Sequence, residues 1–125
     1  MAKRKKTIRR TMGSGRIYIQ STFNNTLITV TDEAGEVLSW GSAGSLGFKG
    51  TRKATPFAAT TVAKNIIDQA KNLGVIRVRI FVKGIGTGRD AALRAIQASD
   101  LDVVSIADTT SMPHNGCRAK KPRRV

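Results

Sequence analysis

The chain has 125 residues, and 22 lysines and arginines against 8 aspartates and glutamates give it a formal net charge of +14. This length predicts one domain, and the charge favours a polyanionic partner. No apolar run approaches the roughly 18 residues of a membrane span, and the N-terminal residues lack the apolar segment of a signal peptide. One cysteine, Cys117, allows no internal disulfide, which suits a reducing compartment such as the cytoplasm.

The positive charge is concentrated at the two ends of the sequence. Residues 1–16 hold seven basic and no acidic residues, residues 109–125 hold five basic and none acidic, and the middle is nearly neutral. We therefore expect a basic N-terminal arm over 1–15, a single α/β domain over 16–108 and a basic C-terminal tail over 109–125. Nucleic acid is favoured over an anionic membrane, because the arms lack the apolar face that an interfacial helix needs.

The first predicted elements are three strands that form an antiparallel meander. Alternating apolar residues indicate strands at 16–23, 27–31 and 37–40. Asn24-Asn25 and residues 32–35 supply the turns between them.

The second half of the chain predicts two helices and two strands. Thr55 and Pro56 indicate a helix N-cap and first helical position, and Gly74 indicates the helix end. A strand over 75–83, a helix over 89–99 and a strand over 101–107 follow. The order β-β-β-α-β-α-β is that of ribonuclease-H-like folds. It predicts a three-layer α/β fold, with a mixed five-stranded sheet of strand order 3-2-1-4-5 and helices packed on it.

A glycine loop joins the fourth predicted strand to the second predicted helix. Gly84, Gly86 and Gly88 lie between Lys83 and Arg89. Glycines permit close backbone approach, and a helix N-terminus attracts anions, so we interpret the loop as a phosphate-binding site, with a plain tight turn as the alternative. Its GxGxG spacing matches neither a dinucleotide fingerprint nor a Walker loop. We expect no cofactor.

Catalysis and metal binding find little support in the sequence. A ribonuclease-H-like nuclease needs a carboxylate on its first strand to hold metal ions, and residues 17–23 contain none. His114 and Cys117 have an H-x-x-C spacing, but a structural zinc site needs four ligands. We predict a protein without enzymatic activity or metal; a nuclease-like enzyme and a general DNA-compacting protein are the alternatives.

Two further features leave alternatives open. Arg77, Arg79 and Lys83 share one side of a predicted strand, which is either solvated or in contact with RNA. Asn115-Gly116 forms an ordinary turn or converts to isoaspartate, because glycine leaves its backbone nitrogen unshielded. Aromatic residues make up only 5% of the chain, so we expect contacts mainly to phosphate and sugar rather than stacked bases.

Four motifs in order give the chain a family resemblance. They are Gly47-Phe48-Lys49-Gly50-Thr51-Arg52-Lys53, Thr55-Pro56-Phe57-Ala58-Ala59, Lys83-Gly84-Ile85-Gly86-Thr87-Gly88-Arg89 and Pro113-His114-Asn115-Gly116-Cys117-Arg118. With them the chain resembles the bacterial-type family of ribosomal small-subunit protein eleven, over nearly the whole length from Gly15. Ile85, Ser111 and Ala119 depart from it, since proline is common there in the family.

The resemblance implies a structural protein on the platform of the small ribosomal subunit, in the cytoplasm or in an organelle. It implies binding to small-subunit rRNA, bridging of rRNA helices and a place along the cleft for the Shine-Dalgarno region of mRNA. Small-subunit proteins seven and eighteen and initiation factor three are the implied partners. The family is also one in which the asparagine of this His-Asn-Gly motif, here Asn115, can become isoaspartate.

The residues expected to contact RNA lie in four segments. They are Lys3, Arg4, Lys5, Lys6, Arg9 and Arg10 in the arm; Lys49, Arg52 and Lys53 in a loop; Lys83, Gly84, Gly86, Gly88 and Arg89 in the glycine loop; and His114, Asn115, Arg118, Lys120, Lys121, Arg123 and Arg124 in the tail.

Overall fold

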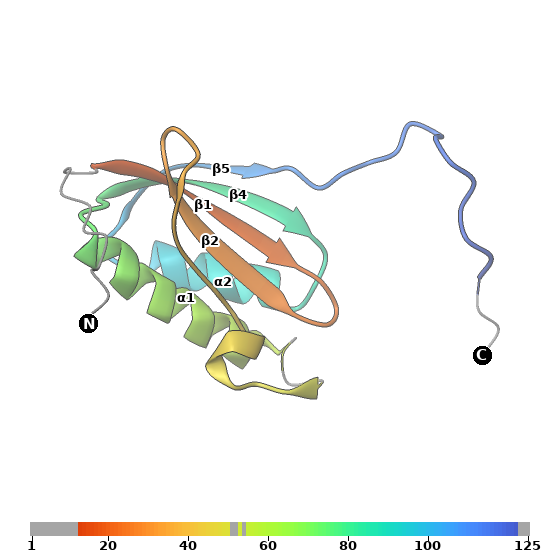
Figure 1. Ribbon diagram of the computed structural model, residues 1–125, viewed down its shortest axis with the longest axis horizontal. Helices are drawn as coiled ribbons and strands as arrows, with labels where there is room; N and C mark the ends of the chain where they lie inside the picture. The colour runs from red at the N-terminus through yellow and green to blue at the C-terminus, as the bar shows by residue number, and fades with distance from the viewer. Residues whose placement is uncertain (1–12, 51–52, 54, 123–125) are drawn as a thin grey trace, which may run out of the picture.

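The computed structural model describes residues 13–50, 53 and 55–122 (Figure 1). Its elements are β1 (Ser14–Ser21), β2 (Thr26–Asp32), β3 (Val37–Ser42), the short 3-10 helix η1 (Gly44–Leu46), α1 (Pro56–Asn72), β4 (Arg77–Gly84), α2 (Gly88–Gln97) and β5 (Asp102–Asp108). The expected strands and the two expected α-helices are all present, with boundaries that differ by a few residues.

The five strands form one mixed sheet in the order β3-β2-β1-β4-β5. β1 pairs antiparallel with β2, and β2 pairs antiparallel with β3. β4 lies parallel to β1 on one side and to β5 on the other. The predicted sheet and its strand order are therefore confirmed.

Both helices lie on the same face of this sheet (Figure 1). α1 connects β3 to β4 and α2 connects β4 to β5, so both crossovers join parallel strands and advance across the sheet in the same direction. Right-handed crossovers that advance in one direction must place their helices on one face. The described residues thus form two layers, one of helices and one of strands. The expected third layer is absent from them, because both crossovers place their helices on the same face of the sheet.

The hydrophobic core lies between the sheet and the helices. Alternate residues of the three central strands point into it and are buried, among them Ile17, Ile19, Ile28, Val30, Val78, Ile80 and Val82. Alanines on the inner side of the helices, such as Ala59, Ala63 and Ala92, are completely buried. Their small side chains let the helix backbones come close to the sheet.

The ends of two predicted strands differ from the alternating pattern. Alternation places Phe23 on the same side as Ile17 and Ile19, and Ile76 on the same side as Val78 and Ile80, yet these two side chains are 74% and 59% exposed. Phe23 lies in the turn after β1, and Ile76 precedes β4, so neither continues the pleat of its strand. Val75 is buried instead, at 2% exposure.

The boundaries of α1 follow the predicted signals. The Thr55 side chain accepts a hydrogen bond from the backbone N–H of Ala58 at 3.2 Å, and Pro56 is the first helical residue. At the other end Gly74 has φ of 88°, a left-handed value that suits glycine, and its N–H donates to the carbonyl of Lys71. No helix in the described part of the chain is long and apolar enough to cross a membrane.

Candidate nucleic-acid interface

Three of the segments predicted to contact RNA start from one edge of the sheet. β3, β4 and β5 run in the same direction, so their carboxyl ends share an edge. The loop with Lys49 and Lys53 follows β3, the glycine loop follows β4, and the tail follows β5. Figure 1 shows the loop after β3 near the start of α1 and the tail extending away from the same end of the molecule.

The glycine loop packs directly against the turn between β1 and β2. A Cβ atom on Gly84 would overlap with the backbone oxygen of Ser21, and one on Gly86 would overlap with Ser21 Oγ and the Thr22 carbonyl oxygen. Gly84 also has φ of 94°. These glycines are therefore required by close packing of the two loops. Sequence reasoning missed this role, because nothing in the motif indicates which segment lies against it.

Gly88, the first residue of α2, is packed just as closely. A Cβ atom there would overlap with Thr26 Oγ1 and lie 2.8 Å from Cβ of Ala59. The hydroxyl oxygens of Ser21 and Thr26 are buried beneath this region and have no hydrogen-bond partner among the described residues. Burial of unpaired hydroxyls costs free energy. Because Gly86 and Gly88 lie directly against these two oxygens, no residue larger than glycine fits at either position.

Arg89 has partners within the protein. Its Nη1 donates to the carbonyl oxygen of Gly84 at 3.0 Å, and its Nη2 lies 2.7 Å from Oδ2 of Asp108. The hydroxyl of Thr110 donates to Oδ1 of Asp108 at 2.6 Å, and the N–H of Thr110 donates to the same atom at 3.0 Å. The two hydrogen bonds from Thr110, together with Arg89, hold the pKa of Asp108 well below its usual range.

This network ties the first residues of the tail to the glycine loop. The N–H of Thr109 donates to the Val82 carbonyl oxygen at 2.8 Å, and the N–H of Gly84 donates to Thr110 Oγ1 at 3.1 Å. We call Arg89, Asp108 and Thr110 the tail clamp. The clamp fixes where the tail leaves the sheet, so Arg89 has a positioning role that its sequence motif did not indicate.

Beyond the clamp the tail is exposed and has no regular secondary structure up to residue 122. It carries His114, Asn115, Arg118, Lys120 and Lys121 of the predicted contact residues. Asn115 has φ of 59°, the one positive value at a non-glycine residue in the described ranges. The chain thus bends at His114 and Asn115.

The loop after β3 presents Lys49 to solvent and keeps Lys53 half-buried. Phe48 in this loop packs edge-on against Phe57 at the start of α1, with ring centroids 6.0 Å apart. This contact anchors the loop to the helix. The remaining predicted contact residues lie outside the described residues: Lys3, Arg4, Lys5, Lys6, Arg9, Arg10, Arg52, Arg123 and Arg124.

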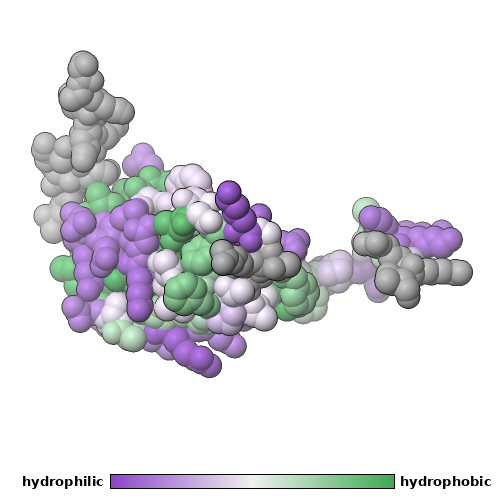
Figure 2. All heavy atoms as spheres, turned by 90° about the horizontal axis from the view of Figure 1, so that it is seen from below, coloured by the Kyte–Doolittle hydropathy of each residue, from purple (hydrophilic) through white to green (hydrophobic). Residues whose placement is uncertain are grey.

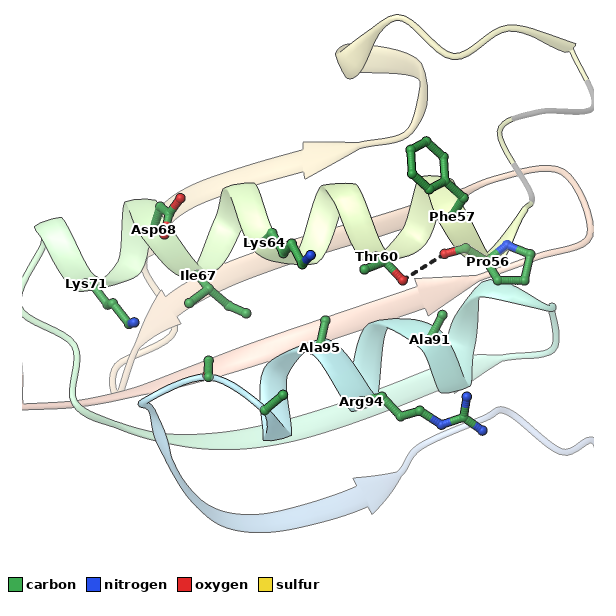
Figure 3. Close-up of a pocket in the computed structure, with 12 residues that line it drawn as sticks. Pro56, Phe57, Thr60, Lys64, Ile67, Asp68, Lys71, Ala91, Arg94 and Ala95 are labelled. Carbon is green, nitrogen blue, oxygen red and sulfur yellow. Dashed lines mark hydrogen bonds between the residues drawn. The ribbon is translucent and has the colours of Figure 1, made fainter.

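A groove of about 630 Å³ runs between α1 and α2 on the outer side of the helices (Figure 3). Ile67, Ala91 and Ala95 form its apolar part, and Figure 2 shows hydrophobic side chains between hydrophilic ones on this face. Its charges are mixed, since Asp68 lies among Lys64, Lys71 and Arg94, and Lys71 pairs with Asp100 at 3.3 Å. The groove is therefore less suited to a polyanion than the basic edge loops.

The described residues contain no group of three or more histidines, cysteines, aspartates or glutamates that could hold a metal ion. His114 and Cys117 lie on the exposed tail.

Comparison with known proteins connects this architecture to one family. The family model described as ribosomal protein S11 matches residues 15–124. The chain belongs to the ribosomal protein S11 family. The predicted family is thereby confirmed, and it is a family of structural proteins of the small ribosomal subunit rather than of enzymes.

Curated relatives match almost the whole chain. Small ribosomal subunit protein uS11 of Borreliella burgdorferi (strain ZS7) is 50% identical over 121 residues, covering 97% of this chain and 93% of the relative. Small ribosomal subunit protein uS11c of Phaeodactylum tricornutum is 54% identical, with 98% and 96% covered. The uS11c protein of Cicer arietinum is 57% identical, with 93% and 84% covered. The chain therefore corresponds to these relatives over 84% to 96% of their lengths.

Proposed function

We propose that this ribosomal protein S11 family member binds rRNA on the platform of the small subunit and bridges separate rRNA helices there. The observation that carries the proposal is the shared origin of three segments at one edge of the sheet: the loop with Lys49 and Lys53, the glycine loop and the tail. Segments that leave one edge in different directions can contact different RNA helices. Their lysines and arginines neutralise phosphates, and this binding requires no chemical reaction.

The division of the chain supports this role. In our proposal the α/β domain predicted over residues 16–108 is the rigid body, which in the structure begins two residues earlier, at Ser14 of β1. The residues before it and residues 109–125 are basic arms that enter the RNA. The tail clamp supports this division, because it holds the start of the tail at a fixed place on the body. The arms would then approach the RNA from defined points.

The finer assignments of partners are part of the same proposal. We infer that the protein contributes to the cleft that holds the Shine-Dalgarno region of mRNA and contacts small-subunit proteins seven and eighteen. Initiation factor three is a further partner in this proposal. The support is the family match over residues 15–124, together with the four motifs between Gly47 and Arg118 on which the resemblance rests.

Ultraviolet crosslinking in the source cells, followed by sequencing of the attached RNA, tests the proposal. We expect crosslinks confined to a few platform helices of small-subunit rRNA. Crosslinks scattered over many RNAs, or recovery with DNA, would contradict it and would favour a basic protein that binds nucleic acid without a fixed site. Mapping the crosslinked peptides to the tail or to residues 47–53 would also test the individual contacts.

A further inference from the structure

The face of the sheet opposite the helices carries a pattern of basic and aromatic side chains. Ile17, Ile19, Val78, Ile80 and Val82 point toward the helices. Since successive strand residues point to opposite faces, the residues between them lie on the other face. On β1 these are Arg16 and Tyr18, and on β4 they are Arg77, Arg79, Phe81 and Lys83.

β4 connects the starting points of the two arms. At its first residue the N–H of Arg77 donates to the carbonyl oxygen of Gly13 at 2.8 Å, next to the N-terminal arm. At its last residue the N–H of Gly84 donates to Thr110 Oγ1 at 3.1 Å, at the start of the tail. A polyanion held by both arms can therefore follow β4 across the body.

The basic residues of β4 are spaced along this path. Alternate strand residues lie about 6.6 Å apart, so Arg77, Arg79 and Lys83 form a line of exposed cations along one strand. Arg77 and Arg79 also border a hollow of about 170 Å³ beside Ser14 and Gly15. Successive phosphates of one nucleic-acid strand can therefore each contact one of these cations.

Two arginines stand side by side in this face. Arg16 of β1 and Arg79 of β4 are register partners in the parallel pairing. Like charges on neighbouring strands destabilise a sheet, and Arg16 is only partly compensated, with its Nε 3.7 Å from Oε1 of Glu33. A bound phosphate would relieve the repulsion.

Aromatic side chains form a row across the same face. Trp40 pairs with Thr29, Thr29 pairs with Tyr18, and Tyr18 pairs with Phe81. The rings of Tyr18 and Phe81 are stacked, with centroids 5.2 Å apart, and Trp40 is 59% exposed. Aromatic rings on a basic sheet face offer stacking surfaces to unpaired bases. We had expected no stacking surface from the low aromatic content, which does not reveal that these rings share a row.

The charge on the two faces distinguishes this face from the helix side. The groove between the helices mixes Lys64, Lys71 and Arg94 with Asp68, and Asp100 neutralises Lys71. On the open face the acidic groups are Glu33, which pairs with Arg16, and Asp102, opposite Arg77 in the register. The open face therefore has an excess of positive charge, which Arg79 and Lys83 carry.

From these observations we propose that the open face of the sheet is a second RNA-binding surface, along which a single-stranded segment of rRNA passes between the two basic arms. The proposal rests on the proposed rRNA binding and adds a surface that the arms and edge loops do not include. The phosphates follow Arg77, Arg79 and Lys83, and an unpaired base stacks at the row of Trp40 and Tyr18.

The test compares the salt dependence of binding to in vitro transcribed small-subunit rRNA for the full chain and a double variant, Arg77→Gln with Arg79→Gln. Each phosphate contact contributes about 0.7 to 0.9 to the slope of log affinity against log salt. We expect the variant to lower the slope by about 1.5. A charge-matched control, Lys64→Gln with Arg94→Gln on the helix side, should leave the slope unchanged, and Arg77→Lys with Arg79→Lys should keep it near the parent value.

An unchanged slope in the Arg77 and Arg79 variant, or an equal loss in the control, would overturn the proposal. If the parent chain itself failed to bind the rRNA, the proposed function would be wrong. If the parent bound the rRNA and the Arg77 and Arg79 variant kept the same slope, only the proposed second surface would be wrong. Circular dichroism of each variant verifies that the fold is kept.

A second measurement identifies the occupant directly. Gln20 is exposed on the open face, beside Lys83 in the register. A photoreactive benzoylphenylalanine at this position, in reconstituted small subunits, should crosslink to rRNA. A crosslink to a ribosomal protein, or none at all, would overturn the proposal.

Discussion

Gly86 shows how one residue connects two loops of this protein. A side chain there would overlap with Ser21 Oγ and with the carbonyl oxygen of Thr22. Both belong to the end of β1 and the turn that follows it, and the Thr22 backbone cannot move aside as a flexible side chain can. The glycine is thus a requirement of the folded body.

We predict that Gly86→Ala lowers the free energy of unfolding by about 1 to 3 kcal/mol, the usual cost of overpacking. Urea denaturation measures the change. Gly116→Ala is the matched control, because a Cβ atom there has no neighbour within 4 Å, and it should stay within about 0.5 kcal/mol of the parent. Equal stability of Gly86→Ala and the parent would mean that the two loops separate easily.

Asp108 makes the tail clamp dependent on pH. Its pKa is lowered by the hydrogen bonds from Thr110 and by Arg89. A carboxyl whose pKa is lower in the folded than in the unfolded state stabilises the fold above the unfolded pKa, near 3.9, and loses this effect as the pH falls further. We predict that Asp108→Asn is less stable than the parent at pH 7 and that the difference shrinks below about pH 4.

Urea denaturation of parent and Asp108→Asn in parallel tests this, because the comparison cancels the titration of the other carboxyls. Hydrogen exchange provides a local readout. The amides of Gly84 and Thr109 should exchange faster in the variant, since both are hydrogen-bonded next to the clamp. A difference in stability that stays constant down to pH 2 would show that the carboxylate charge is not involved.

Two features of Asn115 favour isoaspartate formation. It is exposed, and the following Gly116 leaves the backbone nitrogen unshielded. We predict that isoaspartyl-specific methylation labels the aged purified protein at residue 115 and that Gly116→Val suppresses the label. Absence of methyl uptake by the parent would show that isoaspartate does not form at residue 115.

Among the elements, α1 depends on its first turn. The Thr55 side chain accepts a hydrogen bond from the N–H of Ala58, one of the amides that a helix start leaves unpaired. We predict that Thr55→Ala lowers the free energy of unfolding by about 1 kcal/mol. Thr55→Ser retains the hydroxyl and should lose much less, which thermal or urea denaturation can verify. An equal loss of stability in both variants would mean that the methyl group of Thr55, rather than its hydroxyl, stabilises the start of α1.

At the scale of the whole molecule, the body and the arms have separate tasks. The core lies between the sheet and two helices within residues 14–108. We predict that deletion of residues 1–10 or 118–125 weakens rRNA binding and flattens its salt dependence, because each lost phosphate contact lowers the slope by about 0.7 to 0.9. Circular dichroism should show an unchanged fold, and an unchanged slope would refute the role of the arms.

The sequence by itself determined the element order, the strand order and the charged ends. Alternation in β1 and β4, the Thr55-Pro56 start of α1 and Gly74 at its end are local signals, and each depends on residues within a few positions of one another. The four motifs identified the family for the same reason, since a motif is read without knowing what it touches.

Only the tertiary structure decided what the functional residues contact. Arg89 meets Asp108, and Gly86 meets Ser21, across segments that are distant in sequence, so no local pattern indicates either pair. Alternation also separates the two sides of a strand without showing which side the helices cover. That choice follows from the direction of the crossovers, and it leaves Arg77, Arg79 and the aromatic row on a face that no described helix covers.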